Sequence, residues 1–374
     1  MKKLLYNYIK EIMKIFFVIN RFAGGGAERV MSTLANYFAS SGEEVYIDYD
    51  TDYPSAYKLN DKIISLNHIS KLRRSWAYKI GILRFPYKLF LLRKNIKSIH
   101  PDVVVSFVTE NNGPLILAAL GLKTKVIVSE HSRVEGFNNS RKNEFIKKYI
   151  YRLADAVTVL TRHDYNKWKK YGNVVRMPNP ISLEVDDVDI SKKSKVVLGV
   201  GRLDDYKIKG LDTLLKCWSG VCHKYPDWRL QVAGDGSIEN KQILQEFSDS
   251  LQNINVDFLG FRKDINSVMR ESAIFLLSSR VEGLPMGLIE AMNQSCCCVA
   301  FDVETGPSEI IRNNISGLLV ENQNVDALTN ALDKVLSDED LRFFLSGNAK
   351  SEVTKYGVER IINRWRILFG VLGK

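Results

Sequence analysis

The sequence has no run of about 18 or more apolar residues, so no segment has the length and apolarity that a membrane-spanning helix needs. It also lacks a recognisable signal peptide, because neither a continuous apolar core nor a small-residue cleavage site follows the basic start Met-Lys-Lys-Leu-Leu. We therefore expect a cytoplasmic protein. A second Met-Lys pair at Met13 directly precedes the first predicted strand, so residues 1–12 are either a short amphipathic addition or a start-site artefact.

Cysteine is scarce, and its spacing excludes the common thiol sites. The five cysteines are Cys217, Cys222 and the run Cys296-Cys297-Cys298. Neither group has the paired C-x2-C spacing of zinc or redox sites. We expect small buried thiols in a reducing compartment.

The length and composition are those of a two-domain globular protein. The 374 residues, 45% hydrophobic and 26% charged, are too many for one ordinary core but suit two α/β domains. The net charge of +10 is unevenly shared: residues 1–180 hold 30 Lys and Arg against 15 Asp and Glu, whereas the remainder holds 23 against 28. We therefore expect the two halves to have different partners.

Acidic residues are absent from 71–99, the most basic part of the chain. This segment carries nine Lys and Arg, with tryptophan, tyrosine and phenylalanine between them. Such a combination favours an anionic bilayer surface. The alternative is a solvated helix face whose aromatic residues lie in the core. We do not expect nucleic-acid binding, because no recognition motif accompanies the charge.

The first half of the sequence alternates between strands and helices, which predicts a parallel sheet covered on both faces. The strand candidates are Ile15–Ile19, Glu44–Tyr49, Val103–Phe107, Lys125–Ser129 and Ala156–Leu160. Two prolines at Pro178 and Pro180, followed by the polar stretch Glu184–Lys195, mark a linker.

The same alternation then restarts and predicts a second domain of the same kind. Its strand candidates are Val196–Val200, Arg229–Ala233, Val256–Leu259, Ile274–Leu277, Cys298–Phe301 and Gly317–Val320. A helical tail from about Val353 to Leu372 has an apolar face and needs a surface to pack on, which we expect the first domain to supply.

Glycine-rich loops follow several predicted strands. Gly24-Gly25-Gly26 lies between the first strand and a helix, where backbone N–H groups can approach an anion, although a plain tight turn is an equal alternative. Its spacing is not the G-x-G-x-x-G of dinucleotide sites. In the second half, Gly201-Arg202 and Lys207 to Gly210 together can hold a diphosphate without a metal, because two cations neutralise its charge.

Two further motifs carry acidic or titratable side chains. His131, in Ser-Glu-His, follows a first-half strand at the sheet edge where ligands bind, although a lone histidine is more often structural. In the second half, Glu282 and Glu290 flank Gly-Leu-Pro-Met-Gly, a loop leading into a helix that we expect to start near Pro285. The free N–H groups around Met286 can meet a phosphate or a sugar hydroxyl.

The ordered set of motifs resembles family 4 of the retaining GT-B glycosyltransferases over nearly the whole chain. The set is Gly-Gly-Ala-Glu, Ser-Glu-His, Asn-Pro at the linker, Gly-x-Gly-Arg with a downstream Lys-Gly, Gly-Asp-Gly and Glu-x7-Glu. The resemblance implies an α/β GT-B fold, in which two Rossmann-like domains with parallel sheets face a central cleft. Residues 1–178 would bind the acceptor, with a C-terminal helix at 355–374 packing back on them, and residues 179–354 would bind the donor.

Site roles follow from the resemblance by position. The catalytic candidates are His131 facing the transferred sugar, Glu282 on the sugar hydroxyls, and Arg202 and Lys209 neutralising the donor diphosphate. Lys207 competes with Lys209, because the interval from the arginine is longer than the commonest family form; we favour Lys209, which Gly210 follows. The remaining donor-binding candidates are Gly25, Gly26, Gly201, Gly234, Gly236, Gly283, Pro285, Met286, Gly287, Leu288 and, on the ribose, Glu290.

The resemblance also implies the reaction. A hexose or N-acetylhexosamine would move, with retention of configuration, from a nucleotide sugar that we expect to be UDP-linked to a polyprenyl-diphosphate-linked glycan for O-antigen, capsule or related polysaccharide. The enzyme would work peripherally at the inner face of the bacterial cytoplasmic membrane.

No metal or other cofactor is expected. The Asp-x-Asp patterns that could suggest one begin at Asp48, Asp50 and Asp187, at a strand end and in the linker, and we attribute them to chance. Two alternatives to the transferase stay open: a sugar-nucleotide epimerase of the same architecture, which needs no acceptor, and a non-catalytic nucleotide-sugar-binding subunit.

Overall fold

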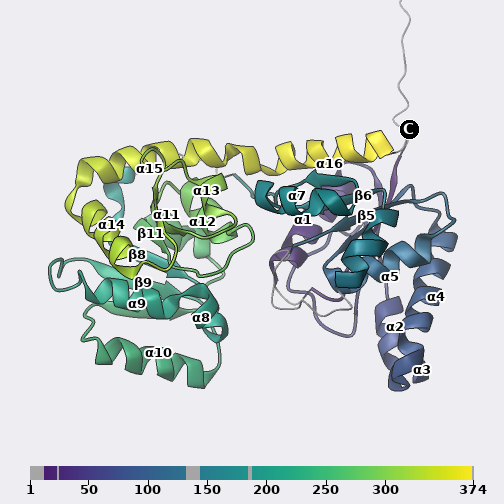
Figure 1. The fold of residues 1–374 in the computed structure, drawn as a ribbon, viewed down its shortest axis with the longest axis horizontal. Helices are drawn as coiled ribbons and strands as arrows, with labels where there is room; N and C mark the ends of the chain where they lie inside the picture. Colours follow the sequence, from purple (N-terminus) through teal and green to yellow (C-terminus); the bar gives the residue numbers. More distant parts are fainter. Residues whose placement is uncertain (1–11, 23–24, 132–143, 184–187, 373–374) are drawn as a thin grey trace, which may run out of the picture. The chain divides into compact units, whose positions relative to one another are not determined.

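The computed structural model describes residues 12–22, 25–131, 144–183 and 188–372, and the chain forms two compact units (Figure 1). Unit 1 comprises Met1–Leu160, Tyr165–Met177 and Ile362–Lys374, and unit 2 comprises Thr161–Asp164 and Pro178–Ile361. Each unit is built on one parallel sheet with helices packed around it, the architecture that alternating strands and helices predict.

Unit 1 has a seven-stranded sheet of order β3-β2-β1-β4-β5-β6-β7, and every strand pair is parallel. Its strands are β1 (Lys14–Val18), β2 (Glu44–Asp48), β3 (Ile64–Leu66), β4 (Val103–Phe107), β5 (Lys125–Ser129), β6 (Ala156–Val159) and β7 (Val174–Arg176). All five residues of β4 are buried, because helices cover both faces of a parallel sheet.

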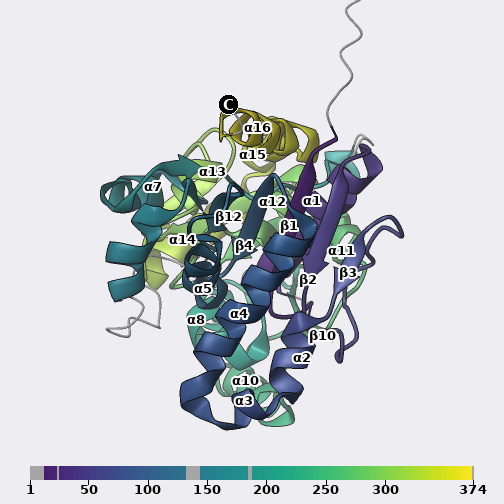
Figure 2. The same ribbon diagram turned by 90° about the vertical axis from the view of Figure 1, so that its right-hand side faces the viewer.

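The helices of unit 1 follow the strands in turn. They are α1 (Gly26–Ser40), α2 (His68–Arg74), α3 (Trp76–Lys79), α4 (Gly81–Ile99), α5 (Thr109–Ala119) and α7 (Arg162–Trp168), which begins in unit 2; shorter turns are η1 (Ile146–Ile150), η2 (Tyr151–Leu153) and η3 (Lys169–Tyr171). Figure 2 shows α4 running alongside the sheet with α2 and α3 next to it.

Unit 2 has a six-stranded parallel sheet of order β10-β9-β8-β11-β12-β13. Its strands are β8 (Ser194–Val200), β9 (Arg229–Ala233), β10 (Val256–Gly260), β11 (Ser272–Leu277), β12 (Cys297–Asp302) and β13 (Leu318–Glu321). Its helices are α8 (Tyr206–Lys209), α9 (Leu211–Ser219), α10 (Ile238–Ser250), α11 (Ile265–Glu271), α12 (Met286–Asn293), α13 (Pro307–Ile310), α14 (Val325–Ser337) and α15 (Glu339–Val353), with turns η4 (Ile190–Lys192), η5 (Leu203–Asp205) and η6 (Thr354–Tyr356).

The five cysteines all lie in unit 2, and the prediction that they are buried thiols is confirmed. Each is free and buried. Cys217, Cys222 and Cys297 belong to one apolar cluster that also contains Trp218 and Trp228. They act as small apolar side chains in the core.

The C-terminal tail differs from the single helix that its apolar spacing predicts. Val353 ends α15, and a short turn and Gly357 separate it from α16 (Val358–Leu372). The boundary between the units falls inside α16. Within unit 1, the ring of Phe369 packs against Phe38 with the centroids 5.5 Å apart.

Part of the expected linker is strand, and part of it and of the chain start lies outside the described residues. Ser194 and Lys195 already belong to β8, so the expected linker ends earlier than the sequence indicates. Residues 184–187 of that linker, Gly24 and most of the stretch 1–12 lie outside the described residues. Within the described residues, no helix combines the length and apolarity needed to cross a membrane.

Candidate functional site

The loop between β11 and α12 carries Glu282 and brings it to Lys209. Lys209 Nζ lies 2.9 Å from Glu282 Oε1, and only 9% of Glu282 is exposed. The hydroxyl of Thr305 donates to the Glu282 carbonyl and fixes the loop from the side of β12. The structure therefore joins two of the four residues that the sequence singles out as catalytic candidates.

Gly210 explains why Lys209 is placed there. Its backbone is left-handed, with φ +62°, and a Cβ at this position would lie 1.9 Å from the Ser278 carbonyl oxygen. The Ser278 hydroxyl donates to the Gly210 carbonyl at 2.8 Å. Because only glycine permits this approach, the end of α8 is held against the loop that leads to Glu282.

Lys207 has a different partner. Its Nζ lies 3.1 Å from Asp212 Oδ2, and Arg280 Nη1 contacts the other carboxylate oxygen at 2.7 Å. Burial raises the pKa of Asp212, but the hydrogen bonds from Arg280 and Lys207 outweigh burial and hold the pKa below its usual value. The structure thus separates the two competing lysines, one beside Glu282 and one in a three-residue ion-pair network.

Arg202 lies in the turn after β8 with 80% of its side chain exposed, and its Nη2 is 2.5 Å from Asp205 Oδ2. The neighbouring turns approach each other closely: a Cβ on Gly234 would lie 1.8 Å from the Gly201 carbonyl oxygen. A Cβ on Gly236 would lie 2.8 Å from Leu203 Cβ. Close packing of the two turns therefore explains why Gly234 and Gly236 are glycines, whether or not a ligand binds there.

Helix α12 begins at Met286 with Pro285 as its N-cap residue, as the sequence predicts. Gly283 and Leu284 lie in the loop before it, while Gly287, Leu288 and the largely buried Glu290 lie within the helix. The loop after β12 packs on this start, since a Cβ on Gly306 would be 2.4 Å from Pro285 Cδ. The first amides of α12 have no intrahelical acceptor, which is the usual condition for anion binding at a helix start.

In unit 1, Gly25 and Gly26 lie at the start of α1. The Gly25 N–H donates to Glu28 Oε2 at 3.0 Å, and the Tyr57 hydroxyl donates to the Gly25 carbonyl at 3.1 Å. A Cβ on Gly26 would meet nothing within 4 Å. No contact with the described protein therefore explains this glycine.

His131 follows β5 and is held as a neutral ring. Its Nε2 lies 3.0 Å from the Ser129 hydroxyl, and its ring stacks on Phe107 with the centroids 4.7 Å apart. Burial lowers its pKa to about 3. Such an imidazole can donate or accept a hydrogen bond at neutral pH but cannot act as a charged acid.

The residue before His131 forms a buried network that sequence reasoning missed. The Glu130 carboxylate accepts hydrogen bonds from Thr109 at 3.0 Å, from Asn112 at 2.8 Å and from the Tyr151 hydroxyl. Burial and then the Glu130 charge raise the pKa of Tyr151 well above its usual value, so it stays a donor. The network holds the turn after β4, where Val108 adopts an unusual φ of 70° for a β-branched residue.

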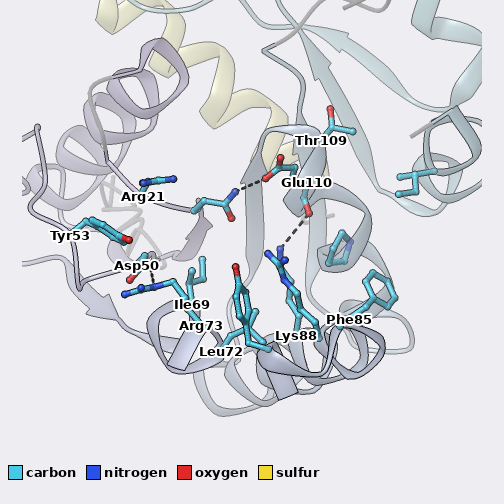
Figure 3. A pocket seen from close by; sticks show the side chains of 16 residues that line it. Arg21, Asp50, Tyr53, Ile69, Leu72, Arg73, Phe85, Lys88, Thr109 and Glu110 are labelled. Carbon is cyan, nitrogen blue, oxygen red and sulfur yellow. Dashed lines mark hydrogen bonds and ion pairs between the residues drawn. The ribbon is translucent and has the colours of Figure 1, made fainter. Parts of the chain in front are cut away.

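A pocket of about 720 Å³ lies entirely within unit 1, and sequence reasoning missed it too (Figure 3). Arg21 follows β1, Asp50 and Tyr53 follow β2, and Glu110 follows β4, so the pocket opens at the carboxyl ends of adjacent strands. Ligands bind at the carboxyl ends of parallel strands, the rule by which the sequence singles out His131. The same rule could have identified these positions from the sequence.

The sequence of this chain matches two family models that divide it between them. The model described as "Glycosyltransferase Family 4" matches residues 24–185, and "Glycosyl transferases group 1" matches residues 182–352. An alpha-1,4-N-acetyl-D-galactosaminyltransferase of Campylobacter jejuni, named for a diNAcBac-PP-undecaprenol substrate carrying GalNAc, is 32% identical over 95% of this chain and 97% of its own. The amylovoran biosynthesis glycosyltransferase AmsD of Erwinia amylovora is 30% identical over 91% and 95%.

A solved structure gives the same fold. HepE of Anabaena, crystallised with UDP and glucose, superposes with a TM-score of 0.77 over 96% of this chain and 99% of its own, at 18% identity. The two parallel-sheet units are thus those of the GT-B fold.

Proposed function

Since the chain belongs to glycosyltransferase family 4, we propose that it transfers a hexose or N-acetylhexosamine from a UDP-sugar to a polyprenyl-diphosphate-linked glycan, with retention of anomeric configuration. The observation that carries the proposal is the Lys209–Glu282 pair beside the start of α12. Relatives that are 30% or more identical are named for undecaprenol-linked sugars and for amylovoran biosynthesis. We assign the product to bacterial surface polysaccharide, such as O-antigen or capsule.

The donor would bind to unit 2. Lys209 and Arg202 would neutralise its diphosphate, together with the amides at Met286 and Gly287. Glu282 would accept hydrogen bonds from the sugar hydroxyls, and Glu290 from the ribose. The exposed Arg202 side chain has a single carboxylate partner in η5, Asp205, among the described residues, so a diphosphate can recruit it.

The reaction would be a front-face displacement. The acceptor hydroxyl oxygen forms a bond to C1 of the donor sugar while the bond from C1 to the diphosphate oxygen breaks, and the hydroxyl proton passes to that leaving oxygen. Lys209 and Arg202 stabilise the negative charge that develops on the leaving group, where preorganised electrostatics act most strongly. Neutral His131 would hydrogen-bond the transferred sugar, and neither a metal nor a protein base is required.

Unit 1 would bind the acceptor and meet the membrane. Three side chains of α3 and α4 lie outside the core: Trp76, Ile82 and Phe90 are 66%, 83% and 60% exposed. Their exposure argues against the alternative interpretation of residues 71–99, in which the aromatic side chains lie in the core. Lys79 and Lys94 lie on the same two helices. Exposed aromatic and aliphatic side chains among lysines suit the interface of an anionic bilayer, and we propose that α3 and α4 dock there.

Release of free nucleotide tests the function. A panel of UDP- and GDP-sugars is incubated with and without a bacterial polyprenyl-diphosphate glycan, comparing wild type, Glu282→Ala and the control Glu246→Ala, which removes an exposed carboxylate of α10. We expect acceptor-dependent release from one donor, lost in Glu282→Ala and kept in the control, with an α-linked product by NMR from an α-linked donor.

The alternatives give different results. Product formed from the donor alone would indicate an epimerase. Nucleotide-sugar binding without turnover of any donor would indicate a binding subunit. Inversion at the anomeric carbon would contradict the retaining mechanism while leaving the transferase itself in place.

A further inference from the structure

The pocket of unit 1 occupies the point where its sheet reverses strand order. β1 and β4 are neighbours, and the chain proceeds from β1 toward β2 on one side and from β4 toward β5 on the other. Ligands of open parallel sheets bind in the crevice outside the carboxyl ends of such strands. Asn20 after β1 donates to Glu110 Oε2 after β4 at 2.9 Å, which ties the two strand ends together beside the pocket (Figure 3).

The cations around this pocket differ in how far the protein neutralises them. Arg73 is compensated: its Nε lies 2.9 Å from Asp50 Oδ2 and its Nη2 lies 2.6 Å from Asp52 Oδ2. Lys88 donates to Asn111 Oδ1 at 2.9 Å and to the Glu110 carbonyl at 3.4 Å, two acceptors without formal charge. Arg73 therefore has its carboxylate partners within the protein.

Arg21 and Arg84 are placed over tyrosine rings instead of carboxylates. The Cζ atom of Arg21 is 5.2 Å from the centroid of Tyr53, and that of Arg84 is 4.2 Å from the centroid of Tyr78. No carboxylate in the described parts of the chain forms an ion pair with either guanidinium. A guanidinium over an aromatic face keeps its N–H donors available, and its planar fork suits the two oxygens of a phosphate or carboxylate.

The pocket also has room and surface for sugar. Its volume of about 720 Å³ exceeds what a single phosphate fills, and Tyr53 and Phe85 supply aromatic surface along its lining. Glu110 and Asp50 supply carboxylate oxygens that can accept from hydroxyl groups. The lining thus combines the features that an anionic carbohydrate needs.

We infer that this pocket binds an oxyanion carried by the acceptor glycan, with Arg21 and Arg84 as its guanidinium ligands. The inference rests on the proposed transfer to a lipid-linked glycan, because the diphosphate of such a lipid is one source of the oxyanion. The carboxylate of an acidic sugar in the glycan is the other source.

Direct measurement of probe binding tests this inference independently of turnover. Isothermal titration with the donor site saturated by UDP would compare three probes: a short-chain prenyl-diphosphate disaccharide, the same disaccharide as a neutral methyl glycoside, and a methyl glycoside containing a uronic acid. The proteins are wild type, Arg21→Gln, Arg84→Gln and the control Lys97→Gln, which removes an exposed cation of α4 outside the pocket.

We expect each arginine variant to bind the anionic probe roughly tenfold more weakly, since a charge-assisted hydrogen bond is lost. Affinity for UDP and for the neutral glycoside, and the control, should not change. A loss confined to the diphosphate probe assigns the lipid as the source, and a loss confined to the uronic acid probe assigns an acidic sugar.

If the wild type and both arginine variants bound every probe with equal affinity, this inference would be overturned and the proposed function would still stand. If the wild type bound none of the three probes, the proposed acceptor class would fail and this inference with it.

Discussion

Two lysines that are two positions apart in the sequence have different environments in the fold. Lys209 faces Glu282 at 2.9 Å, whereas Lys207 pairs with Asp212. We expect Lys209→Ala to lower kcat by roughly 100-fold, because the variant lacks the cation that we propose to stabilise leaving-group charge. Lys207→Ala should lower it less than about tenfold and serves as the matched control. Steady-state kinetics with the identified donor decide, and equal losses would contradict the assignment.

Glu130 shows what a buried carboxylate contributes next to a candidate site. Thr109, Asn112 and Tyr151 all donate to it. In Glu130→Gln the amide nitrogen would face donors, so we expect the free energy of unfolding to fall by about 2 kcal/mol. Urea denaturation measures this change, and Glu246→Gln on the exposed face of α10 should change stability by less than about 0.5 kcal/mol. An unchanged midpoint in Glu130→Gln would show that the network is not stabilising.

Asp48 gives a prediction about pH. It is fully buried at the end of β2, where burial raises its pKa to about 7 despite hydrogen bonds from the His68 and Ile69 amides and the charges of Lys88 and Lys71. The folded state therefore holds a proton that the unfolded chain releases near pH 4, and stability falls as pH rises from about 4 to 7.

Asp48→Asn removes that titration. Its stability relative to wild type should increase by a few kcal/mol between pH 5 and pH 8, because the wild type alone must ionise a buried carboxyl. Urea denaturation of both proteins at the two pH values measures the difference. A constant difference would mean that Asp48 does not titrate with a raised pKa.

At the scale of elements, the basic segment 71–99 contains side chains that bond to the rest of the fold and side chains that are exposed. Arg73 bonds Asp50 and Asp52, and Arg93 donates to the carbonyls of Ala118 and Leu120 at the end of α5, so reversing either charge would disturb the fold. Membrane binding is better tested at Trp76 and Ile82, which are exposed.

We expect the double variant Trp76→Ser, Ile82→Ser to bind anionic vesicles at least about tenfold more weakly in flotation assays, because its insertable apolar area is lost. Phe344→Ser, an exposed site on α15, is the control. Unchanged vesicle binding by the double variant would exclude docking through α3 and α4.

Most strands that sequence reasoning found are largely buried, although every residue of β10 is only partly buried. Val103–Phe107 and Arg229–Ala233 have the predicted bounds. The first is a buried, mostly apolar run and the second alternates polar and apolar residues, and both patterns indicate a strand. β3 and β7 were missed, since each has three residues and β3 is largely exposed, which leaves no hydrophobic signal. The Glu282 loop and the start of α12 were predictable from local chemistry, whereas the pocket depends on loops that only strand order brings together.

At the scale of the whole molecule, the two units hold the proposed donor and acceptor functions in separate sheets. The proposed mechanism needs only protein cations and helix amides on the donor diphosphate, so activity should persist in EDTA. Turnover measured with excess EDTA should stay within about twofold of the untreated enzyme, and restoration of a lost activity by Mg²⁺ or Mn²⁺ would contradict the mechanism.

The cysteines buried in unit 2 have a practical consequence. Because all five are inaccessible and unpaired, a thiol-reactive dye should find no native target in the folded protein. One cysteine introduced on α10 and one on α4 would then be the only labelled positions. The two dyes could be used as donor and acceptor in single-molecule fluorescence energy transfer. Energy transfer between the two dyes would then test whether the distance between α10 and α4 changes when the proposed UDP-sugar donor is added.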